Sequence, residues 1–287
     1  MSDLIQLRFV LALLTALLVC AAARAIENPA KHRQPDVKSS SALVIDVRDA
    51  TVLYERNAGV SRPIASLTKL MTALVVLESG QPLDEEIIIE REDRDGTRGA
   101  ASRLSVGARL TRNELLHLAL MASDNRAAYA LGRSHPGGKS AFVQAMNAKA
   151  RALDMSTARF TDPSGLSPDN IASATDISKL VLAAARQAAI REYSTDRRHS
   201  VLLAKREVEF RNTNYLVAKS DWDIEAQKTG YTSQAGECLA MKTVIQGRSL
   251  VIVLLDSFGK YTRTADARRI RKWLEAQASE RMARSAT

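Results

Sequence analysis

Apolar runs separated by polar stretches divide the chain into predicted helices and strands. Residues 67–77 are almost all apolar, which predicts a helix that is buried on most sides. A second apolar run covers residues 115–121, and the capping-box pattern Thr111-Arg-Asn-Glu114 precedes it. Further helices are predicted at residues 127–133, 139–153, 176–189 and 265–283. The middle of the chain is therefore predicted to be helical.

Runs rich in β-branched residues lie towards both ends of the chain. Residues 42–47 and 51–55 flank a short polar stretch, which predicts an antiparallel hairpin. After Arg206 the pattern changes to strands separated by Gly-containing turns, predicted at residues 224–228, 237–244 and 249–257. This order of elements predicts an α+β fold, with one antiparallel sheet assembled from both chain ends and a helical lobe inserted between them.

The first 40 residues are predicted to precede the folded domain. Arg8, an apolar run at residues 9–23 and Ala23-Arg-Ala25 form a secretory signal peptide pattern, assigned to residues 1–25. The run is shorter than the roughly 20 residues of a spanning helix, so a retained anchor is the less favoured alternative. If the signal peptide is cleaved, the protein is expected to reach the periplasm without a stable membrane anchor. Residues 26–40 are polar, contain two prolines and predict a linker.

Charge and cysteine content narrow the classes of partner. The formal net charge of +9 favours anionic partners such as a cell-wall polymer, a membrane surface or nucleic acid. The export signal and an aromatic content of 5% make nucleic acid the least favoured of these. Cys20 lies in the predicted signal peptide, which leaves Cys238 alone in a predicted strand and predicts no internal disulfide.

The histidines show no metal-ligand spacing and no pairing with an aspartate. They are spread along the chain as His32, His117, His135 and His199. The sequence therefore predicts no metal site and no cofactor.

Ser66-Leu-Thr-Lys69 stands where the buried helix at residues 67–77 begins. Pro63 suits the first turn of a helix, because its missing N–H is not needed there. Residues three apart share a helix face, so the Ser66 hydroxyl and the Lys69 amine are predicted to lie together. Taken alone, the pair is better explained by a capping serine and a lysine that reaches water, so the rest of the chain must decide.

Two further motifs follow in chain order. Ser123-Asp-Asn125 lies in a turn between predicted helices, and Lys228-Thr-Gly230 ends a predicted strand. Separately, the first is explained by a helix N-cap and the second by a strand end. The three motifs in this order and in these contexts form the motif set of serine acyl-transferring enzymes. The sequence therefore predicts Ser66 as a nucleophile.

Acyl transfer assigns a role to each side chain near the predicted nucleophile. A serine needs a base beside it, and Lys69 suits this role if desolvation and a nearby cation lower its pKa. Lys228 is the candidate for that cation. Ser123 can pass a proton to the leaving amine, and Asn125 can hold Lys69 or the substrate backbone.

The end of the third predicted strand suits substrate binding. Lys228 and Thr229 fit a substrate carboxylate, and Gly230 is expected to let the substrate approach the strand closely. The backbone N–H groups of Ser66 and Tyr231 are expected to form an oxyanion hole.

The sequence resembles low-molecular-mass penicillin-binding proteins of the serine D-alanyl-D-alanine carboxypeptidase/endopeptidase family over roughly residues 40–275. Within that family it is most similar to the penicillin-binding D-alanyl-D-alanine endopeptidases. Beyond the three motifs, the resemblance rests on His135-Pro-Gly-Gly, Phe210-Arg-Asn-Thr-Asn, Ala235-Gly-Glu-Cys-Leu and Phe258-Gly-Lys-Tyr-Thr.

The resemblance implies a β-lactamase/transpeptidase-like fold, an α/β sandwich, with residues 41–280 as the catalytic domain. It implies Ser66 as the acylated nucleophile, Lys69 as the base and Ser123 as the proton shuttle. It also implies peptidoglycan peptide stems as substrate and covalent inhibition by β-lactams such as penicillin.

The family leaves several activities open. The membrane-bound carboxypeptidases carry a second, β-rich domain and a C-terminal anchor, for which the chain leaves no room, and this favours a periplasmic endopeptidase that cleaves peptide cross-links. The alternative is a carboxypeptidase that trims terminal D-Ala. A β-lactamase is less favoured, because the loop at residues 162–166 lacks the glutamate that hydrolysis needs. The intact motifs argue against a non-catalytic cell-wall binding protein. Selectivity is expected from the cleft rim at residues 96–102.

Overall fold

The computed structural model describes residues 34–97 and 100–285. The chain divides into two units, residues 1–35 and 36–287, and every element named below belongs to the second. The predicted signal peptide and the predicted linker as far as residue 33 lie outside the described residues.

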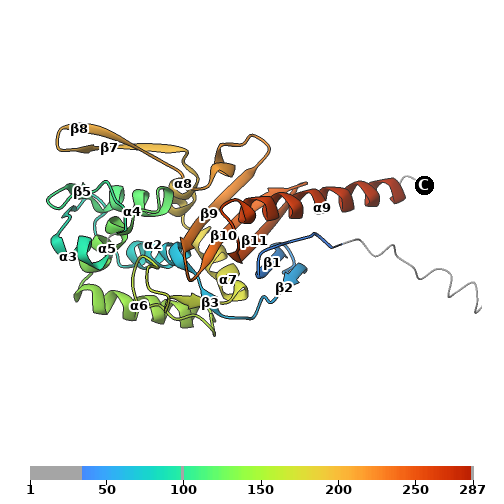
Figure 1. Cartoon of the computed structure of the whole chain (residues 1–287), viewed down its shortest axis with the longest axis horizontal. Helices are drawn as coiled ribbons and strands as arrows, with labels where there is room; N and C mark the ends of the chain where they lie inside the picture. The colour runs from blue at the N-terminus through green and yellow to red at the C-terminus, as the bar shows by residue number, and fades with distance from the viewer. Residues whose placement is uncertain (1–33, 98–99, 286–287) are drawn as a thin grey trace, which may run out of the picture. The chain divides into compact units, whose positions relative to one another are not determined.

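The central sheet draws its strands from both ends of the chain (Figure 1). The strand order is β2-β1-β11-β10-β9, and each neighbouring pair is antiparallel. The strands are β1 (Ser41–Asp46), β2 (Val52–Arg56), β9 (Asp223–Thr232), β10 (Gly236–Ile245) and β11 (Arg248–Ser257). This arrangement confirms the predicted α+β fold and leaves β9 as an edge strand.

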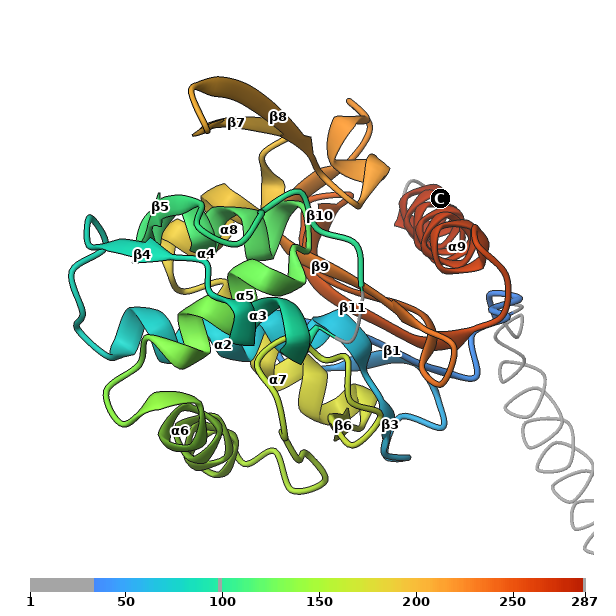
Figure 2. The ribbon, with the colours of Figure 1, turned by 60° about the vertical axis from the view of Figure 1, so that its left-hand side comes forward.

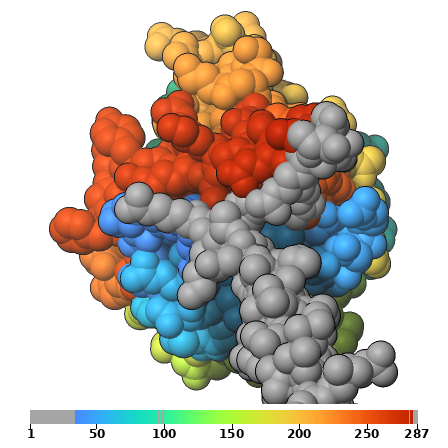
Figure 3. Space-filling view, turned by 90° about the vertical axis from the view of Figure 1, so that its right-hand side faces the viewer, coloured from blue at the N-terminus to red at the C-terminus, as the bar shows by residue number. Residues whose placement is uncertain are grey.

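Successive side chains along each strand point to opposite faces of the sheet, and both faces are covered by packed residues. In β11, Val251 and Val253 pack into the core of the helical lobe, whereas Leu250 packs with Ile270 of α9 (Thr262–Ser285). Figure 2 shows α9 on one side of the sheet and the lobe on the other. Figure 3 shows α9, in red, lying beside the first strands, in blue.

The helical lobe is built around α2 (Thr68–Glu78), which contacts α4, α5, α6 and α7. Its residues from Thr68 to Val76 are all buried, as the apolar sequence predicts. The other helices of the lobe are α3 (Arg91–Gly96), α4 (Arg112–Met121), α5 (Asn125–Arg133), α6 (Gly138–Ala152) and α7 (Ala174–Ala184). Two short strand pairs complete it: β3 (Arg62–Pro63) with β6 (Ile171–Ala172), and β4 (Glu86–Ile88) with β5 (Arg109–Thr111).

The chain enters α2 differently from the expectation. Pro63 lies in β3 and not in the first helical turn, and the 3₁₀ turn η1 (Ala65–Leu67) precedes α2. Ile64 N donates a hydrogen bond of 3.0 Å to Asn170 O. Because this contact fixes the chain just before Ala65, tertiary structure decides where the helix begins.

The sequence did not predict the elements directly before β9. The helix expected at residues 176–189 is interrupted, and α8 (Ala188–Thr195) follows α7 as a separate helix. A loop was predicted at residues 96–102. Its first residue, Gly96, is the last residue of α3, and residues 98–99 lie outside the described part of the chain.

A hairpin of β7 (Arg198–Leu203) and β8 (Arg206–Arg211) stands out from the lobe (Figure 1). Its two turn residues, Ala204 and Lys205, have φ values of 47° and 67°. Such turns match the twist of antiparallel strands. The strands bury only Val201 and Phe210, and the turn residues are neither glycine nor asparagine, so the turn does not mark the hairpin in the sequence.

The ends of the domain pack against each other. Within the predicted linker, the N–H groups of Lys38 and Ser39 donate to the Asp266 carboxylate of α9 at 3.0 Å and 2.7 Å. Residues 36–40 therefore contact the catalytic domain predicted at residues 41–280. Across the described ranges, no helix is both long and apolar enough to cross a membrane.

Candidate active site

Ser66 lies in η1, at the point where the helical lobe meets the edge strand β9. The preceding residue, Ala65, has a φ of 46°, a left-handed conformation that costs energy for a residue with a side chain. The Ser66 hydroxyl accepts a hydrogen bond of 2.8 Å from Lys69 Nζ. The expected pairing of the two side chains is thus present, but it begins in a strained 3₁₀ turn and not in a regular helix.

Lys69 is completely buried and has three hydrogen-bond acceptors around its amine. Besides Ser66, it donates to Asn125 Oδ1 at 2.7 Å and to the Ser164 carbonyl at 2.8 Å. Burial removes the ammonium from water and lowers the pKa of Lys69 to about 7. Half of the amine is then neutral near pH 7, and a neutral amine 2.8 Å from a serine hydroxyl can accept its proton.

This pKa predicts the pH dependence of the reaction. Because the neutral amine is the base, the acylation rate constant should rise as pH increases through about 7 and level off about one unit higher. At pH 6 it should be about a tenth of the plateau value, since one pKa unit is a tenfold change in the neutral fraction. Stopped-flow acylation by a chromogenic β-lactam would measure this profile. A rate constant that stays flat from pH 6 to 8 would show that Lys69 is not the base.

The Ser123-Asp124-Asn125 motif joins α4 to α5. Ser123 has a φ of 59°, so each of the two serines expected to react lies at or next to a left-handed residue. Asp124 is the N-cap of α5 and accepts from Ala127 N at 3.0 Å. The cap explanation of the motif therefore holds together with the functional one, because the capped helix presents Asn125 to Lys69.

Lys228 of β9 is also completely buried, and its amine donates to the Thr229 carbonyl at 2.9 Å. Burial lowers the pKa of Lys228, and the positive charges of Lys69 and Arg263 lower it further. Burial is the largest cause of the low pKa of Lys69, as the sequence analysis expected, and the carboxylates of Asp162 and Asp124 act in the opposite direction. The expected repulsion between the two lysines is present as the lowering of the pKa of Lys228 by the charge of Lys69.

Gly230 and Tyr231 bring β9 against the turn that carries Ser66. A Cβ atom on Gly230 would lie 3.0 Å from both Ser66 N and the Ile64 carbonyl. The glycine was expected to make room for substrate, but the protein's own backbone already needs that room. Strand β9 therefore runs directly against η1, and the oxyanion hole expected from the Ser66 and Tyr231 N–H groups stays a prediction.

Arg263, at the start of α9, is a residue that the sequence analysis missed. Its Nη1 donates to the Gly230 carbonyl at 2.7 Å and to the Cys238 carbonyl at 3.2 Å. In a trans peptide the N–H points opposite to the C=O, so the guanidinium polarises the peptide group whose N–H is that of Tyr231. Arg263 thus strengthens the expected oxyanion donor from behind.

The sequence analysis considered the loop at residues 162–166 only for its missing glutamate, and it did not assign the loop at residues 162–170 to the site. Asp162 Oδ1 accepts from Ser164 N and from Gly165 N, both at 2.7 Å, and this fixes the Ser164 carbonyl that faces Lys69. Asn170 Nδ2 donates to Thr68 Oγ1 at 3.1 Å. The loop is therefore fastened to the first turn of α2 and forms one wall around the Lys69 amine.

Gly165 is the residue that lets this loop approach η1. Its φ is +84°, and a Cβ atom there would lie 1.9 Å from the Ala65 carbonyl. We expect Gly165→Ala to lower the free energy of unfolding by more than about 2 kcal/mol and to slow acylation, because the turn carrying Ser66 must move. Gly107→Ala is the matched control, since Gly107 has a φ of +88° and no atom within 4 Å of the added Cβ. Urea denaturation would test this, and equal losses for the two variants would contradict it.

Of the four histidines, His32 lies outside the described residues, and His117 and His199 make contacts elsewhere in the fold. His117 and His199 stack with ring centroids 3.9 Å apart, and His117 Nε2 lies 3.0 Å from Asp196 Oδ2. The sequence analysis was wrong to find no His/Asp pair, because α4, β7 and the end of α8 bring these residues together. Burial lowers the pKa of His117 to about 4, so its ring is neutral. Among the described residues, no group of three His, Cys, Asp or Glu side chains is placed to hold a metal ion.

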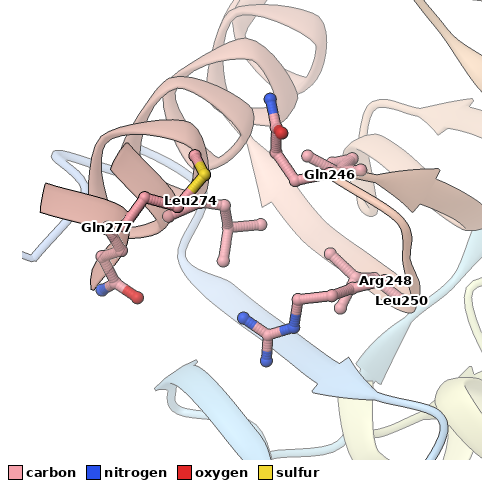
Figure 4. A pocket seen from close by; sticks show the side chains of 8 residues that line it. Gln246, Arg248, Leu250, Leu274 and Gln277 are labelled. Carbon is pink, nitrogen blue, oxygen red and sulfur yellow. The ribbon is translucent and has the colours of Figure 1, made fainter. Parts of the chain in front are cut away.

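Two other features also lie outside the site. Cys238 is a free, buried thiol of β10, and burial raises its pKa to about 12, which makes it unreactive. Figure 4 shows side chains that line a pocket between α9 and the sheet, and the volume of this pocket is about 240 Å³. Its lining includes Leu250 and Leu274, and also Arg248, whose charge is paired with Asp46 at 2.9 Å.

Comparison of the sequence with known proteins shows the family to which the chain belongs. The family model described as D-alanyl-D-alanine carboxypeptidase matches residues 28–259. A D-alanyl-D-alanine endopeptidase of Pseudomonas aeruginosa is 46% identical over 84% of this chain and 79% of its own length. A D-alanyl-D-alanine endopeptidase of Escherichia coli is 43% identical over the same shares of the two chains.

Solved structures show the same fold. The Streptomyces K15 DD-transpeptidase superimposes with a TM-score of 0.78 at 26% identity, covering 85% of this chain and 99% of that structure. The match confirms the predicted β-lactamase/transpeptidase-like fold.

Proposed function

Because the chain belongs to the D-alanyl-D-alanine carboxypeptidase family, we propose that it is a serine DD-peptidase that cleaves peptide cross-links of peptidoglycan through an acyl-enzyme at Ser66. The observation that carries this proposal is the hydrogen bond from a fully buried lysine, Lys69, to the Ser66 hydroxyl. A buried amine with a pKa of about 7 is matched to the removal of a proton from serine at neutral pH.

In the acylation step, Ser66 Oγ attacks the carbonyl carbon of a D-Ala residue while Lys69 takes the hydroxyl proton. The negative charge on the carbonyl oxygen is stabilised by the N–H groups of Ser66 and Tyr231. The C–N bond then breaks, and Ser123 relays the proton from the Lys69 ammonium to the departing amine. The products are an ester at Ser66 and a free amine.

In the deacylation step, water attacks the ester carbonyl and Lys69 accepts a proton from the water. The proton returns to Ser66 Oγ as the ester bond breaks, which releases a carboxylic acid and restores the enzyme. A β-lactam would acylate Ser66 in the same way. Its amine remains attached to the acyl group through the opened ring, so the inhibitor stays bound to the protein.

The substrate assignment rests on the relatives and on the charge of the site. The two relatives at 46% and 43% identity are named endopeptidases. In our proposal Lys228 and Thr229 bind the carboxylate next to the scissile bond, and Asn125 holds Lys69 and the substrate backbone. The net charge of +9 suits an anionic cell-wall polymer, and the signal peptide pattern supports a periplasmic location.

A digest of purified cross-linked muropeptides separates this proposal from its main alternative. We expect dimers to be converted to monomers without release of free D-Ala, and the Ser66→Ala protein to leave the dimers intact. Mass spectrometry of the products measures both. Free D-Ala with intact dimers would contradict the endopeptidase assignment and indicate a carboxypeptidase, the activity that describes the family.

A further inference from the structure

A groove lies beside Ser123, and neither Lys69 nor Lys228 lines it. Its volume is about 460 Å³, within the range of sites that bind small molecules. One wall is the loop at residues 101–103, the floor is the turn at residues 122–124, and the other wall is the base of the β7–β8 hairpin at residues 209–211. Neither wall belongs to the three sequence motifs.

The loop wall is fastened to the turn that carries Ser123. Ser102 Oγ donates to Asp124 Oδ2 at 2.8 Å, so the loop is tied to the second residue of the Ser-Asp-Asn motif. Arg126 Nη1 donates to the Leu104 carbonyl at 2.6 Å and ties the loop a second time. The position of this wall is therefore set by the catalytic turn itself.

The hairpin wall is tied to the same turn. Thr213 N, just after β8, donates to the Met121 carbonyl at 3.1 Å, at the end of α4. Phe210 is buried, with 3% of its surface exposed, and anchors the hairpin base in the core. The hairpin that projects from the lobe thus places its base, rather than its tip, at the reacting centre.

The charges of the groove are mostly paired within the protein. Arg211 Nε lies 2.9 Å from Glu209 Oε1, and Asp124 caps α5. Arg103 differs, because its guanidinium carbon lies 3.8 Å above the ring of Phe210. In the described part of the chain it has no carboxylate partner. A guanidinium stacked on a ring keeps the donors at its edge free for a planar carboxylate.

The proposed reaction determines which part of the substrate lies beside Ser123. Ser123 gives its proton to the leaving amine, so whatever is attached to that amine must extend past Ser123. In a carboxypeptidase reaction this is a single D-Ala. In a cross-link it is a whole second peptide, which needs a further binding surface.

We propose that the groove between residues 101–103 and 209–211 binds the second peptide of the cross-link, and that Arg103 takes one of that peptide's carboxylates. This inference rests on the proposed function. It assigns to Arg103 a role in selecting cross-linked over terminal substrate.

The test compares a substrate that fills the groove with one that does not. Arg103→Gln should lower kcat/KM for a cross-linked muropeptide dimer by about 10- to 100-fold, mainly through KM, because a charged hydrogen-bonded pair is lost. Acylation by benzylpenicillin, which has no second peptide, should change less than about twofold. Arg103→Lys should recover part of the loss, since the charge remains but the planar fork does not.

Arg159→Gln is the matched control, because Arg159 is an exposed arginine with one partner, Asp169 at 3.0 Å, and does not line the groove. It should leave both rates unchanged. Parallel losses with dimer and penicillin for Arg103→Gln would indicate a structural role and overturn the inference, as would unchanged rates with both. If the wild-type protein is acylated by penicillin but does not cleave dimers, the proposed function itself fails, and this inference with it.

Discussion

Replacing Ser66 by alanine is expected to abolish the covalent adduct with penicillin and to slow cleavage of cross-linked muropeptides by at least about 10³-fold. The variant lacks the only atom that can form the ester. The fold should survive, because the Ser66 hydroxyl makes its hydrogen bond to Lys69 rather than to the core. Intact-protein mass spectrometry and muropeptide kinetics measure the two effects.

Ser61→Ala provides the matched control for this variant. Ser61 lies five residues before Ser66, and its exposed hydroxyl donates to the Thr157 carbonyl at 3.2 Å. The control should be labelled by penicillin like the wild type. A Ser66→Ala protein that is labelled at the wild-type rate would rule out the serine mechanism at this position.

Replacing Lys69 by glutamine is expected to slow acylation by about 10²- to 10⁴-fold, the usual contribution of a general base. Glutamine can still donate to Asn125 and to the Ser164 carbonyl, so the burial of the site should be kept. It cannot accept the Ser66 proton at any pH. The residual rate should therefore lose the rise near pH 7 that the pKa of Lys69 gives the wild type.

The same stopped-flow acylation assay tests this variant. Lys69→Arg should be as slow as the glutamine variant, because a guanidinium stays protonated. A glutamine variant that retains the rise near pH 7 would show that another group, such as Lys228, is the base.

The residues proposed to react could be placed from the sequence because each motif is short and stands in a recognisable local context. An apolar run marks α2, a capping box marks α4 and a β-rich run marks β9, so Ser66, Ser123 and Lys228 could be placed on known elements from the sequence. Their meeting at one point follows from the order of strands at the two ends of the chain. The structure confirms that both chain ends contribute strands to one antiparallel sheet.

The supporting residues were not predictable, because their roles depend on contacts between distant segments. Gly165 looks like any turn glycine until the Ala65 carbonyl is found 1.9 Å from where its Cβ would be. Arg263 is one of many arginines near the start of α9, and only the fold brings it to the Gly230 carbonyl. The left-handed φ of Ala65 likewise has no local signal, since it is held by the surrounding structure.

The β7–β8 hairpin shows the limit of pattern-based prediction. Its strands bury only Val201 and Phe210, and its turn contains Ala204 and Lys205 rather than glycine or asparagine. A short polar and apolar alternation at residues 207–211 is present, but turn chemistry does not mark the hairpin. The groove beside Ser123 was hidden for the same reason, because one of its walls is the base of this hairpin.

The most direct test of the central claim is to map the penicillin adduct in the wild-type protein by tryptic digestion. Trypsin should release Ser66 in the peptide of residues 57–69, because the bond between Arg62 and Pro63 resists cleavage, and Ser123 in the peptide of residues 113–126. We predict that the mass of penicillin is found on the first peptide, at Ser66. An adduct on the second peptide, or no adduct on either, would contradict a Ser66 acyl-enzyme.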